Sequence, residues 1–328
     1  LIIINWRRDS MKKYIVLTLA VVLVMSVALT GCAPQKTNLI LATGGTSGTY
    51  YPFGGSMAQI FNSKIQNMNV TAQATGASVE NLKLIGQKEA ELAIVQNDMT
   101  DYAYNGTEAF KDSKIANVRV IANLYPEVIQ IVSSADSGIK TLTDIKGKKF
   151  SVGAPGSGVE ANARQLLDVM GMTYNDFSAN YLSFAESADS LKDNHIDGFL
   201  FVSGIPNAAI QDTATTSSLN FVSIPDDVIK KLIDKYPFFT EFVIPAGTYK
   251  GQTADVKTVA MKATLVAGAE VSEQVIYSIT KALFENQPEL ASAHAKGAEL
   301  SLENAVNGVS VPFHPGAEKY YKEVGAIK

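Results

Sequence analysis

The chain has 328 residues, of which 46% are hydrophobic and 18% are charged. These values are ordinary for a folded globular protein, and the length is sufficient for two domains of typical size. The formal net charge is −4, whereas nucleic-acid binding needs a basic surface, so we expect no nucleic-acid partner.

The N-terminal residues have the features of an export signal. Met11–Lys13 is charged and precedes an apolar run over residues 14–29, which is too short to span a bilayer comfortably. Residues 29–32, Leu-Thr-Gly-Cys, then match a lipobox, in which a signal peptidase cuts before the cysteine and a diacylglycerol is attached to its sulfur. Cys32 is the only cysteine, which favours lipidation because an oxidising compartment penalises a stray thiol. A plain secretory signal with a chance cysteine is the alternative.

We therefore expect residues 1–31 to be removed and the protein to be extracytoplasmic, in the periplasm or on the outer face of the cytoplasmic membrane. A lipid on Cys32 would anchor it to that membrane, with residues 32–37 as the tether. Residues 1–10 precede the signal, and either Met11 as the true initiator or an extended charged region would account for them. Residues 1–31 carry four Lys or Arg and one Asp, so their removal changes the formal net charge from −4 to −7.

From residue 38 onward, short apolar runs alternate with longer amphipathic ones, which is typical of an α/β protein with largely parallel sheets. The pattern predicts strand, helix, strand, helix and strand in turn, over residues 38–43, 49–64, 70–74, 78–86 and 92–95. Two further β-rich runs, 118–124 and 128–134, are separated by Tyr125-Pro126-Glu127. Because proline cannot donate to a sheet ladder, we expect a crossing between two sheets at this break.

The same order of elements begins again near residue 150 and predicts a second lobe. Its strands and helices alternate over residues 150–153, 157–170, 180–183, 187–194 and 198–202. After a Thr- and Ser-rich stretch, we expect a helix at 226–236, a strand at 258–267, a helix at 272–286 and a helical C-terminal part. The last part is expected to return to the first lobe near Ile244. Lobe 1 would then comprise residues 38–126 and 244–328, and lobe 2 residues 127–243.

Each predicted lobe contains one glycine-rich turn between a strand and a helix. The first is LATGGTSGTYYPFGG from Leu41, and the second is SVGAPGSGVEANARQLL from Ser151. In the second, Ser157 is expected to cap the helix and Glu160 to bind back to the cap in a capping box. In the first, Ser47 is the expected cap and Pro52 falls in the first turn. Glycines expose the amides at such helix starts, where the dipole favours an anion; two well-capped helix starts with no ligand are the alternative.

The sequence offers no constellation for catalysis, and we expect no enzyme activity, no cofactor and no metal. Neither glycine-rich loop fits G-x-G-x-x-G or the lysine-bearing phosphate loop, and Ser157 lacks the flanking glycines of a nucleophile elbow. No cysteine follows Cys32, and no H-x-x-x-H supports a zinc site. The three histidines stand apart in polar or loop contexts, and we expect them at the surface: His195, His294 and His314.

Polar side chains follow several predicted strands. Gln96 and Asp98 come just after the 92–95 strand, Glu127 lies at the proposed crossing, and Glu186 with Ser187 follows a strand of the second lobe. Each fits a helix cap or a solvated turn, or alternatively a ligand contact. A buried carboxylate facing a cleft can pair with a ligand ammonium group. Aromatic residues at 50, 51 and 53 provide an apolar wall with polar tips, although helical spacing turns some of them to the core.

A set of motifs, taken in order, resembles a known family. They are TGGTSGTYYPFGG, QATGASVENLKLI, ELAIVQNDMTDYAYNG, LYPEVIQIV, VGAPGSGVEANARQLL, YLSFAESADSLKD, IPAGTYKGQ, TKALFEN and PFHPGAEKYYKE. Together they are similar to the TAXI family of solute receptors from TRAP transporters. The similarity covers Leu39–Gly325, nearly all of the chain after the tether.

The resemblance implies an α/β fold of the two-lobed periplasmic binding protein type II. Each lobe would be a mainly parallel sheet flanked by helices, with the ligand in the cleft between the lobes. It also implies a partner membrane permease driven by an ion gradient, usually sodium, and a small carboxylate ligand such as glutamate or glutamine. The residues that it places around the cleft are Gly45, Thr46, Ser47, Tyr51, Gln96, Asp98, Glu127, Ser157 and Gly158.

Combining the loops with the resemblance, we expect a small carboxylate, most simply an acidic amino acid, between two helix N-termini. Its carboxylate would lie on the amides and hydroxyls of Ser47 and Ser157, and Glu127 or Asp98 would hold an ammonium group. No arginine clamp for the carboxylate is evident, and Arg164 is the only candidate. A sensory or scavenging receptor without a permease, or an exported enzyme, would be the alternatives.

Overall fold

The computed structural model describes residues 36–328, so the expected signal at 1–31 and the lipidation site at Cys32 lie outside the described residues. The strands are β1 (Thr37–Ala42), β2 (Met68–Gln73), β3 (Leu92–Gln96), β4 (Val118–Ser134), β5 (Lys149–Ser151), β6 (Ser178–Asn180), β7 (Gly198–Ser203), β8 (Leu219–Phe221), β9 (Thr240–Ile244) and β10 (Val256–Gly268). The helices are α2 (Tyr50–Lys64), α3 (Ser78–Gln87), α4 (Asn97–Asn105), α5 (Gly158–Met170), α6 (Phe184–Lys192), α7 (Ala208–Thr216), α8 (Asp226–Lys235), α9 (Glu273–Glu285), α10 (Gln287–Ala293), α11 (Leu302–Val306) and α12 (Pro315–Glu323). Within the described part of the chain, no helix is both long and apolar enough to cross a membrane.

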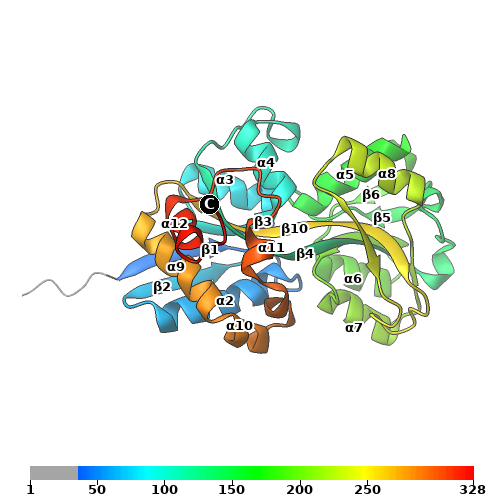
Figure 1. Cartoon of the computed structure of the whole chain (residues 1–328). Coiled ribbons are helices and arrows are strands. Elements are labelled where there is room, and N and C mark those ends of the chain that lie inside the picture. The colour runs from blue at the N-terminus through cyan, green and yellow to red at the C-terminus, as the bar shows by residue number, and fades with distance from the viewer. Residues whose placement is uncertain (1–35) are drawn as a thin grey trace, which may run out of the picture. The chain divides into compact units, whose positions relative to one another are not determined.

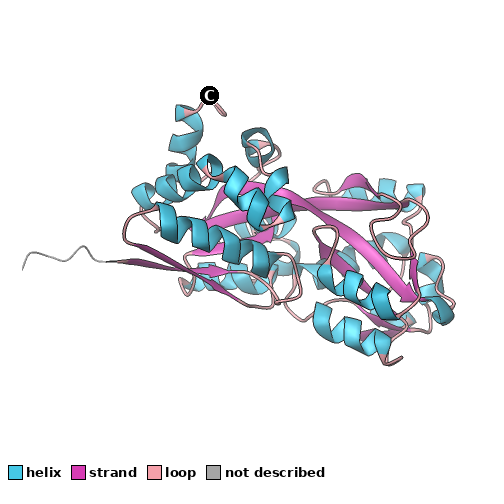
Figure 2. Ribbon diagram, turned by 90° about the horizontal axis from the view of Figure 1, so that it is seen from below, coloured by secondary structure: helices cyan, strands magenta, loops and turns pink. Residues whose placement is uncertain are grey.

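Two lobes share a pair of long strands, and the predicted α/β two-lobed fold is confirmed (Figure 1). β4 and β10 pair antiparallel and continue from one lobe into the other, as Figure 2 also shows. The first lobe adds β3, β1 and β2 beside β10, with β1 parallel to β3. The second adds β7, β5 and β6 beside β4, with β5 parallel to both of its neighbours. The parallel strands therefore lie on opposite sides of the shared antiparallel pair.

β4 runs through Pro126 without a break, but the expected crossing does lie there: Leu124 and Tyr125 pack in the first lobe's core and Val128 and Ile129 in the second's. Pro126 lies opposite Lys262 of β10, while pairing with β7 begins only at Val128. Its missing N–H therefore removes no ladder bond to β7 at this point. The pairing with β10 shifts register between Ala263 and Thr264, where the two strands pass from one lobe to the other.

The return to the first lobe falls later in the chain than the expected position near Ile244. The start of β10 pairs with β9, and Tyr249 and Val256 belong to an apolar cluster with Phe199 and Phe201 of β7. Only from Ala263 onward does β10 contribute to the first lobe's cores. The structure therefore places residues 244–260 with the second lobe and the return within β10 itself.

Each lobe buries both faces of its sheet. In β3, Leu92 and Ile94 join the cluster under α2 and α9, while Ala93 and Val95 join the cluster under α3 and α4. β7 alternates in the same way between two clusters of the second lobe. This explains why both strands are continuous apolar runs, as expected for strands covered by helices on both sides.

The contact between α12 and α9 gives a test of the packing. A Cβ at Gly316 of α12 would lie 2.2 Å from the backbone oxygen of Glu273 and 2.5 Å from the backbone nitrogen of Tyr277. Because neither backbone atom can move aside cheaply, we expect Gly316→Ala to lower the free energy of unfolding by at least about 1–3 kcal/mol. Denaturant unfolding monitored by circular dichroism measures this.

Gly55→Ala is the matched control in α2, because nothing lies within 4 Å of its added Cβ. There we expect a neutral effect or a gain of about 0.5–1 kcal/mol from helix propensity. Equal unfolding midpoints for the two variants would contradict the close α9–α12 packing.

Candidate functional site

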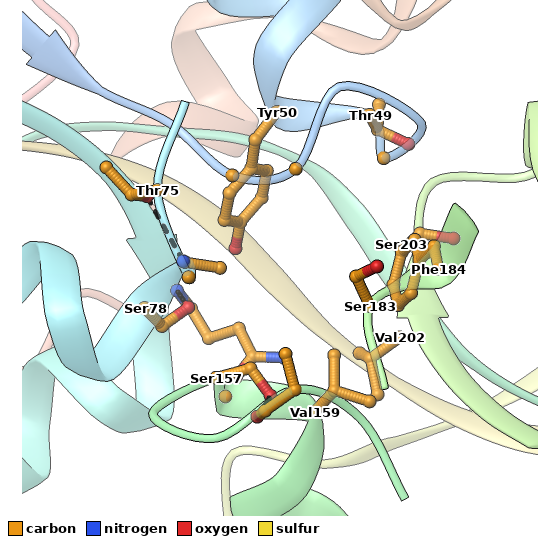
Figure 3. A pocket seen from close by; sticks show the side chains of 18 of the residues that line it. Thr49, Tyr50, Thr75, Ser78, Ser157, Val159, Ser183, Phe184, Val202 and Ser203 are labelled. Carbon is orange, nitrogen blue, oxygen red and sulfur yellow. Dashed lines mark hydrogen bonds between the residues drawn. The ribbon is translucent and has the colours of Figure 1, made fainter. Parts of the chain in front are cut away.

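A cavity of about 140 Å³ lies between the lobes and is lined by loops and strand ends of both (Figure 3). The lining residues are Gly44, Gly45, Gly48, Thr49, Tyr50, Thr75, Gly76, Ala77, Ser78, Gln96, Glu127, Ala154, Ser157, Gly158, Val159, Ser183, Phe184, Val202 and Ser203. Most of them follow a strand directly or begin a helix. The cavity is therefore at the carboxyl ends of the strands, where open α/β sheets bind ligands.

Four helices begin at the cavity wall, two more than the sequence predicted. α2 and α3 come from the first lobe, and α5 and α6 from the second; the first residue of each is a lining residue. Each N-terminus carries a partial positive charge and unpaired amides. None of the lining residues in the described part of the chain is Lys or Arg. An anion in this cavity would therefore meet backbone amides and hydroxyl groups, not a side-chain cation.

The start of α2 differs from the expected arrangement. Thr49, not Ser47, is the N-cap, and no side chain caps the helix. Gly48 donates to the carbonyl of Gly45 at 3.0 Å, so the loop closes its own turn before the helix begins. Thr46 and Ser47 lie on that turn and are not lining residues, whereas Gly45 is.

Tyr50, rather than the expected Tyr51, faces the cavity. Tyr50 is buried, lines the cavity and donates its hydroxyl to Glu127 Oε2 at 2.5 Å. Tyr51 is half-buried and is not a lining residue. Consecutive residues of a helix point about 100° apart. The sequence motif therefore identified the right turn of α2 but not which of the two tyrosines faces the cavity.

The start of α5 matches the expectation in part. Ser157 is the N-cap and accepts from the backbone of Glu160 at 3.1 Å, as predicted. The returning half of the capping box is absent, because the amide of Ser157 donates to Ala154. Glu160 instead binds Arg164 Nε at 2.7 Å and the hydroxyl of Tyr174 at 2.9 Å. Arg164 is thus paired with Glu160 and does not line the cavity.

At the start of α6, the residues that line the cavity are not the ones that the sequence suggested, Glu186 and Ser187. Ser183 and Glu186 form a complete capping box, with the amide of Ser183 donating to Glu186 Oε2 at 2.8 Å. Ser183 and Phe184 line the cavity, while Glu186 serves the cap and Ser187 bonds to Ser151 at 2.7 Å. The S-x-x-E pattern beginning at Ser183 was the signal that could have found this helix start.

Buried amides and one carboxylate join the two lobes beside the cavity. We call these five residues the interlobe network: Gln96, Asp98 and Tyr102 of the first lobe, and Asn162 and Gln165 of α5. Asn162 accepts from Gln96 at 2.8 Å and donates to Asp98 Oδ2 at 2.9 Å. Gln165 donates to the hydroxyl of Tyr102 at 3.1 Å.

The interlobe network brings the backbones of the two lobes close together. A Cβ at Gly158 would lie 1.8 Å from Gln96 Oε1, so any larger residue there would displace the Gln96 amide from its present position. A backbone bond from Glu80 of α3 to Gly156 at 3.1 Å adds to the contact. Asp98 is 1% exposed and is not a lining residue; burial raises its pKa to about 6. Asp98 thus joins the lobes, while Gln96 both joins them and lines the cavity.

Glu127 is the one carboxyl group among the described residues that line the cavity. It is 2% exposed, and burial raises its pKa to about 8, against the lowering effect of the bond from Tyr50. Burial also raises the pKa of Tyr50, so its hydroxyl keeps its proton and donates. Among the described residues, no Lys, Arg or His forms a salt bridge with Glu127. An uncompensated carboxyl at this depth is therefore largely protonated near neutral pH.

The histidines do not all lie at the surface as expected. His195 is exposed, but His314 is buried and caps α12 by accepting from Gly316 at 3.2 Å, and His294 is half-buried. Burial lowers the pKa of both His294 and His314. Within residues 36–328, no group of three or more metal-binding side chains comes together. His294 and His314, the two histidines that are not at the surface, are each the N-cap of a helix.

Two lobes joined by a pair of long strands, with a cavity between helix N-termini of both lobes, define the type II periplasmic binding protein fold. A sequence model of the NMT1-like family matches residues 41–325. The chain therefore belongs to the NMT1-like family.

Solved structures show the same fold at low sequence identity. The alkanesulfonate-binding protein SsuA of Xanthomonas axonopodis pv. citri, bound to MOPS, matches with a TM-score of 0.50 and 14% identity over 88% of this chain and 85% of its own. A protein from glutathione import through GshT and the cystine ABC importer TcyBC of Streptococcus mutans matches with a TM-score of 0.51 and 12% identity, over 86% of this chain and 100% of its own. A putative L-cystine ABC transporter protein of Listeria monocytogenes gives 0.50 and 13%, over 81% and 98%.

Removal of Asn162 tests whether the interlobe network holds the lobes together. Asn162→Ala leaves Gln96 and Asp98 without their partner when the lobes are in contact, at a cost of about 1–3 kcal/mol for each buried group. Water satisfies the same groups when the lobes part. We expect a larger radius of gyration in small-angle X-ray scattering of the protein without added ligand.

Asn175→Ala is the control, because Asn175 is exposed and its recorded bond is through its backbone amide. We expect its scattering to match the unsubstituted protein. If Asn162→Ala also matches it, the network does not control the separation of the lobes.

Proposed function

We propose that this protein is an extracytoplasmic receptor that binds a small carboxylate, with glutamate or a related amino acid as the first candidate, and delivers it to a membrane permease. The observation that carries the proposal is the convergence of four helix N-termini on a cavity without a lining cation. Such a site attracts an anion through amides and dipoles. The predicted signal and lipidated Cys32 would hold the receptor on the outer side of the membrane.

The cavity has complementary groups for both ends of an amino acid. In the proposed mode, the carboxylate lies on the amides at the starts of α2 and α5, beside Gly45, Ser157 and Gly158. Glu127 and the buried Gln96 supply oxygen acceptors for the ammonium group. Gln96 Oε1 is buried and has no hydrogen-bond partner among the described residues, so a ligand donor that reached it would satisfy a buried acceptor.

Lobe closure would convert binding into a signal for the permease. A ligand that touches both lobes favours the form in which they are in contact by its difference in affinity for the two forms. The interlobe network lies beside the cavity and would form in the same movement. The permease would then dock productively on the closed form alone.

The permease is proposed to be of the TRAP type, driven by an ion gradient. This finer assignment rests on the similarity of the sequence motifs to TAXI receptors, whereas two of the solved structures described above come from ABC systems. Uptake of radiolabelled glutamate by proteoliposomes containing the receptor and its permease tests it. We expect uptake with an ion gradient and no ATP; uptake that requires ATP would overturn the TRAP assignment and leave the receptor role standing.

The helix N-termini can be tested with a single added charge. Nothing lies within 4 Å of a Cβ at Gly45, so Gly45→Asp brings a carboxylate to the cavity wall without a backbone clash. Repulsion between two carboxylates at about 5 Å, partly screened by water, should weaken binding about tenfold or more. Isothermal titration calorimetry with glutamate, glutarate and other small carboxylates measures the change.

Gly45→Asn is the matched control, since it adds nearly the same volume without the charge. We expect it to keep most of the affinity. Equal losses for the two variants would show that charge at this position is irrelevant. If no carboxylate binds the unsubstituted protein or raises its melting temperature, the proposed function is wrong.

A further inference from the structure

Glu127 is a buried carboxyl whose one recorded hydrogen bond comes from a neutral group. Tyr50 donates to Oε2 at 2.5 Å, and no bond to Oε1 is recorded. Glu127 lies on β4 where the strand passes between the lobes, so its position is fixed by the sheet on which both lobes depend. It also lines the cavity, so a ligand can reach it.

The groups around Glu127 do not supply a positive charge. Tyr50 of α2 and Tyr125 of β4 belong to the first lobe's core cluster, and Asp98 of α4 adds a repulsive charge that raises the pKa of Glu127 further. The nearby short helix η5 (Ala295–Glu299) contains a buried lysine, Lys296. That lysine binds Glu299 at 2.5 Å instead.

A carboxylate in such surroundings is costly unless it is neutralised or paired. Because burial raises its pKa to about 8, Glu127 is mostly protonated at pH 7. An opposite charge within about 4–6 Å lowers a carboxyl pKa by about 1–3 units. A cation that enters the cavity therefore changes the protonation of Glu127.

We propose that the cavity binds its carboxylate ligand as a zwitterionic amino acid, and that Glu127 releases its proton to the solvent as the ligand's ammonium group takes the proton's place. The inference rests on the proposed function, because it assigns the second end of the same ligand. Glu127 then forms an ion pair with the ammonium group, and the bond from Tyr50 remains. A ligand of the same length without an ammonium group leaves the proton in place.

Proton release fixes the sign of the pH dependence. Below the pKa of ligand-free Glu127, an amino acid can bind only if Glu127 gives up its proton. Proton release becomes easier as the pH rises, so the affinity for an amino acid rises with pH. Between pH 6 and 7.5 the rise should approach about tenfold per unit while Glu127 in the complex stays ionised. Above about pH 8 the contribution of Glu127 is flat.

The experiment is isothermal titration calorimetry at pH 7 in two buffers that differ in ionisation enthalpy, phosphate and Tris. The difference between the observed binding enthalpies gives the number of protons released. For glutamate we expect close to one proton for each bound ligand. Glutarate, which has both carboxylates but no ammonium group, should release close to none.

Two substitutions identify the source of the proton. Glu127→Gln removes the titrating group with little change in volume, and we expect proton release and the rise of affinity with pH both to disappear. Asp98→Asn tests the other buried carboxyl near the cavity. Its effect on affinity is not decisive, but release from Glu127 requires that proton release on glutamate binding persist in this variant. The number released falls only as far as the loss of the Asp98 charge lowers the pKa of ligand-free Glu127.

The outcomes separate this inference from the proposed function. Glutamate binding without proton release overturns the inference and leaves the carboxylate receptor standing. Release that persists in Glu127→Gln, that vanishes in Asp98→Asn, or that occurs equally with glutarate also overturns it. If neither glutamate, glutarate nor any other carboxylate binds, the proposed function itself fails. The comparison of buffers on the unsubstituted protein is informative even if Glu127→Gln does not fold.

Discussion

The antiparallel pairing of β4 with β10 is the constraint on which the rest of the structure depends. Each strand gives one half to each lobe, so the strands of the two lobes form one continuous sheet on either side of the crossing. On one side, β1, β2 and β3 end at the cavity; on the other, β5, β6 and β7 do the same. Four of the helices that follow these strands, α2, α3, α5 and α6, therefore begin at the cavity. The gathering of helix N-termini at the cavity is thus a consequence of topology, and the proposed attraction for an anion needs no charged side chain.

The electrostatics of the cavity follow from this arrangement. Helix N-termini provide donors that cannot be neutralised by pairing with a nearby acid, whereas a lining Arg would form an ion pair with Glu127. Arg164, the arginine considered from the sequence, is instead bound to Glu160 and lies away from the lining. In the proposed mode, Glu127 is consequently left for the ligand's own cation. The two ends of the ligand are then recognised by different means, one by backbone amides and the other by a side chain.

The sequence predicted the fold well because its signals are local and periodic, and it predicted the site less well because side-chain direction depends on packing. Ser157 was found because a cap has a short sequence pattern that the helix start itself enforces. Tyr50 was passed over for Tyr51, since one helical residue turns the side chain by about 100°. Asp98 was placed in the cleft, but α5 of the other lobe covers it, and no local pattern indicates that contact. The return within β10 was missed for the same reason, because pairing with β9 depends on a partner strand that was not recognised.

Gln96 takes part both in the contact between the lobes and in the lining of the cavity. Its amide nitrogen bonds across the lobes to Asn162, while its oxygen is buried and has no recorded partner. An intramolecular hydrogen bond contributes only about 0.5–1.5 kcal/mol net, and an unsatisfied buried acceptor costs about 1–3 kcal/mol. For Gln96 the gain and the cost are therefore comparable, so the contact between the lobes is favoured by the other bonds of the interlobe network and by the bond from Glu80 to Gly156. A shift from 1:99 to 99:1 needs about 5.5 kcal/mol of differential affinity. A ligand that donates to Gln96 Oε1 and to Glu127 satisfies both buried acceptors at once, so recognition of its ammonium group would itself supply part of the free energy that holds the lobes together.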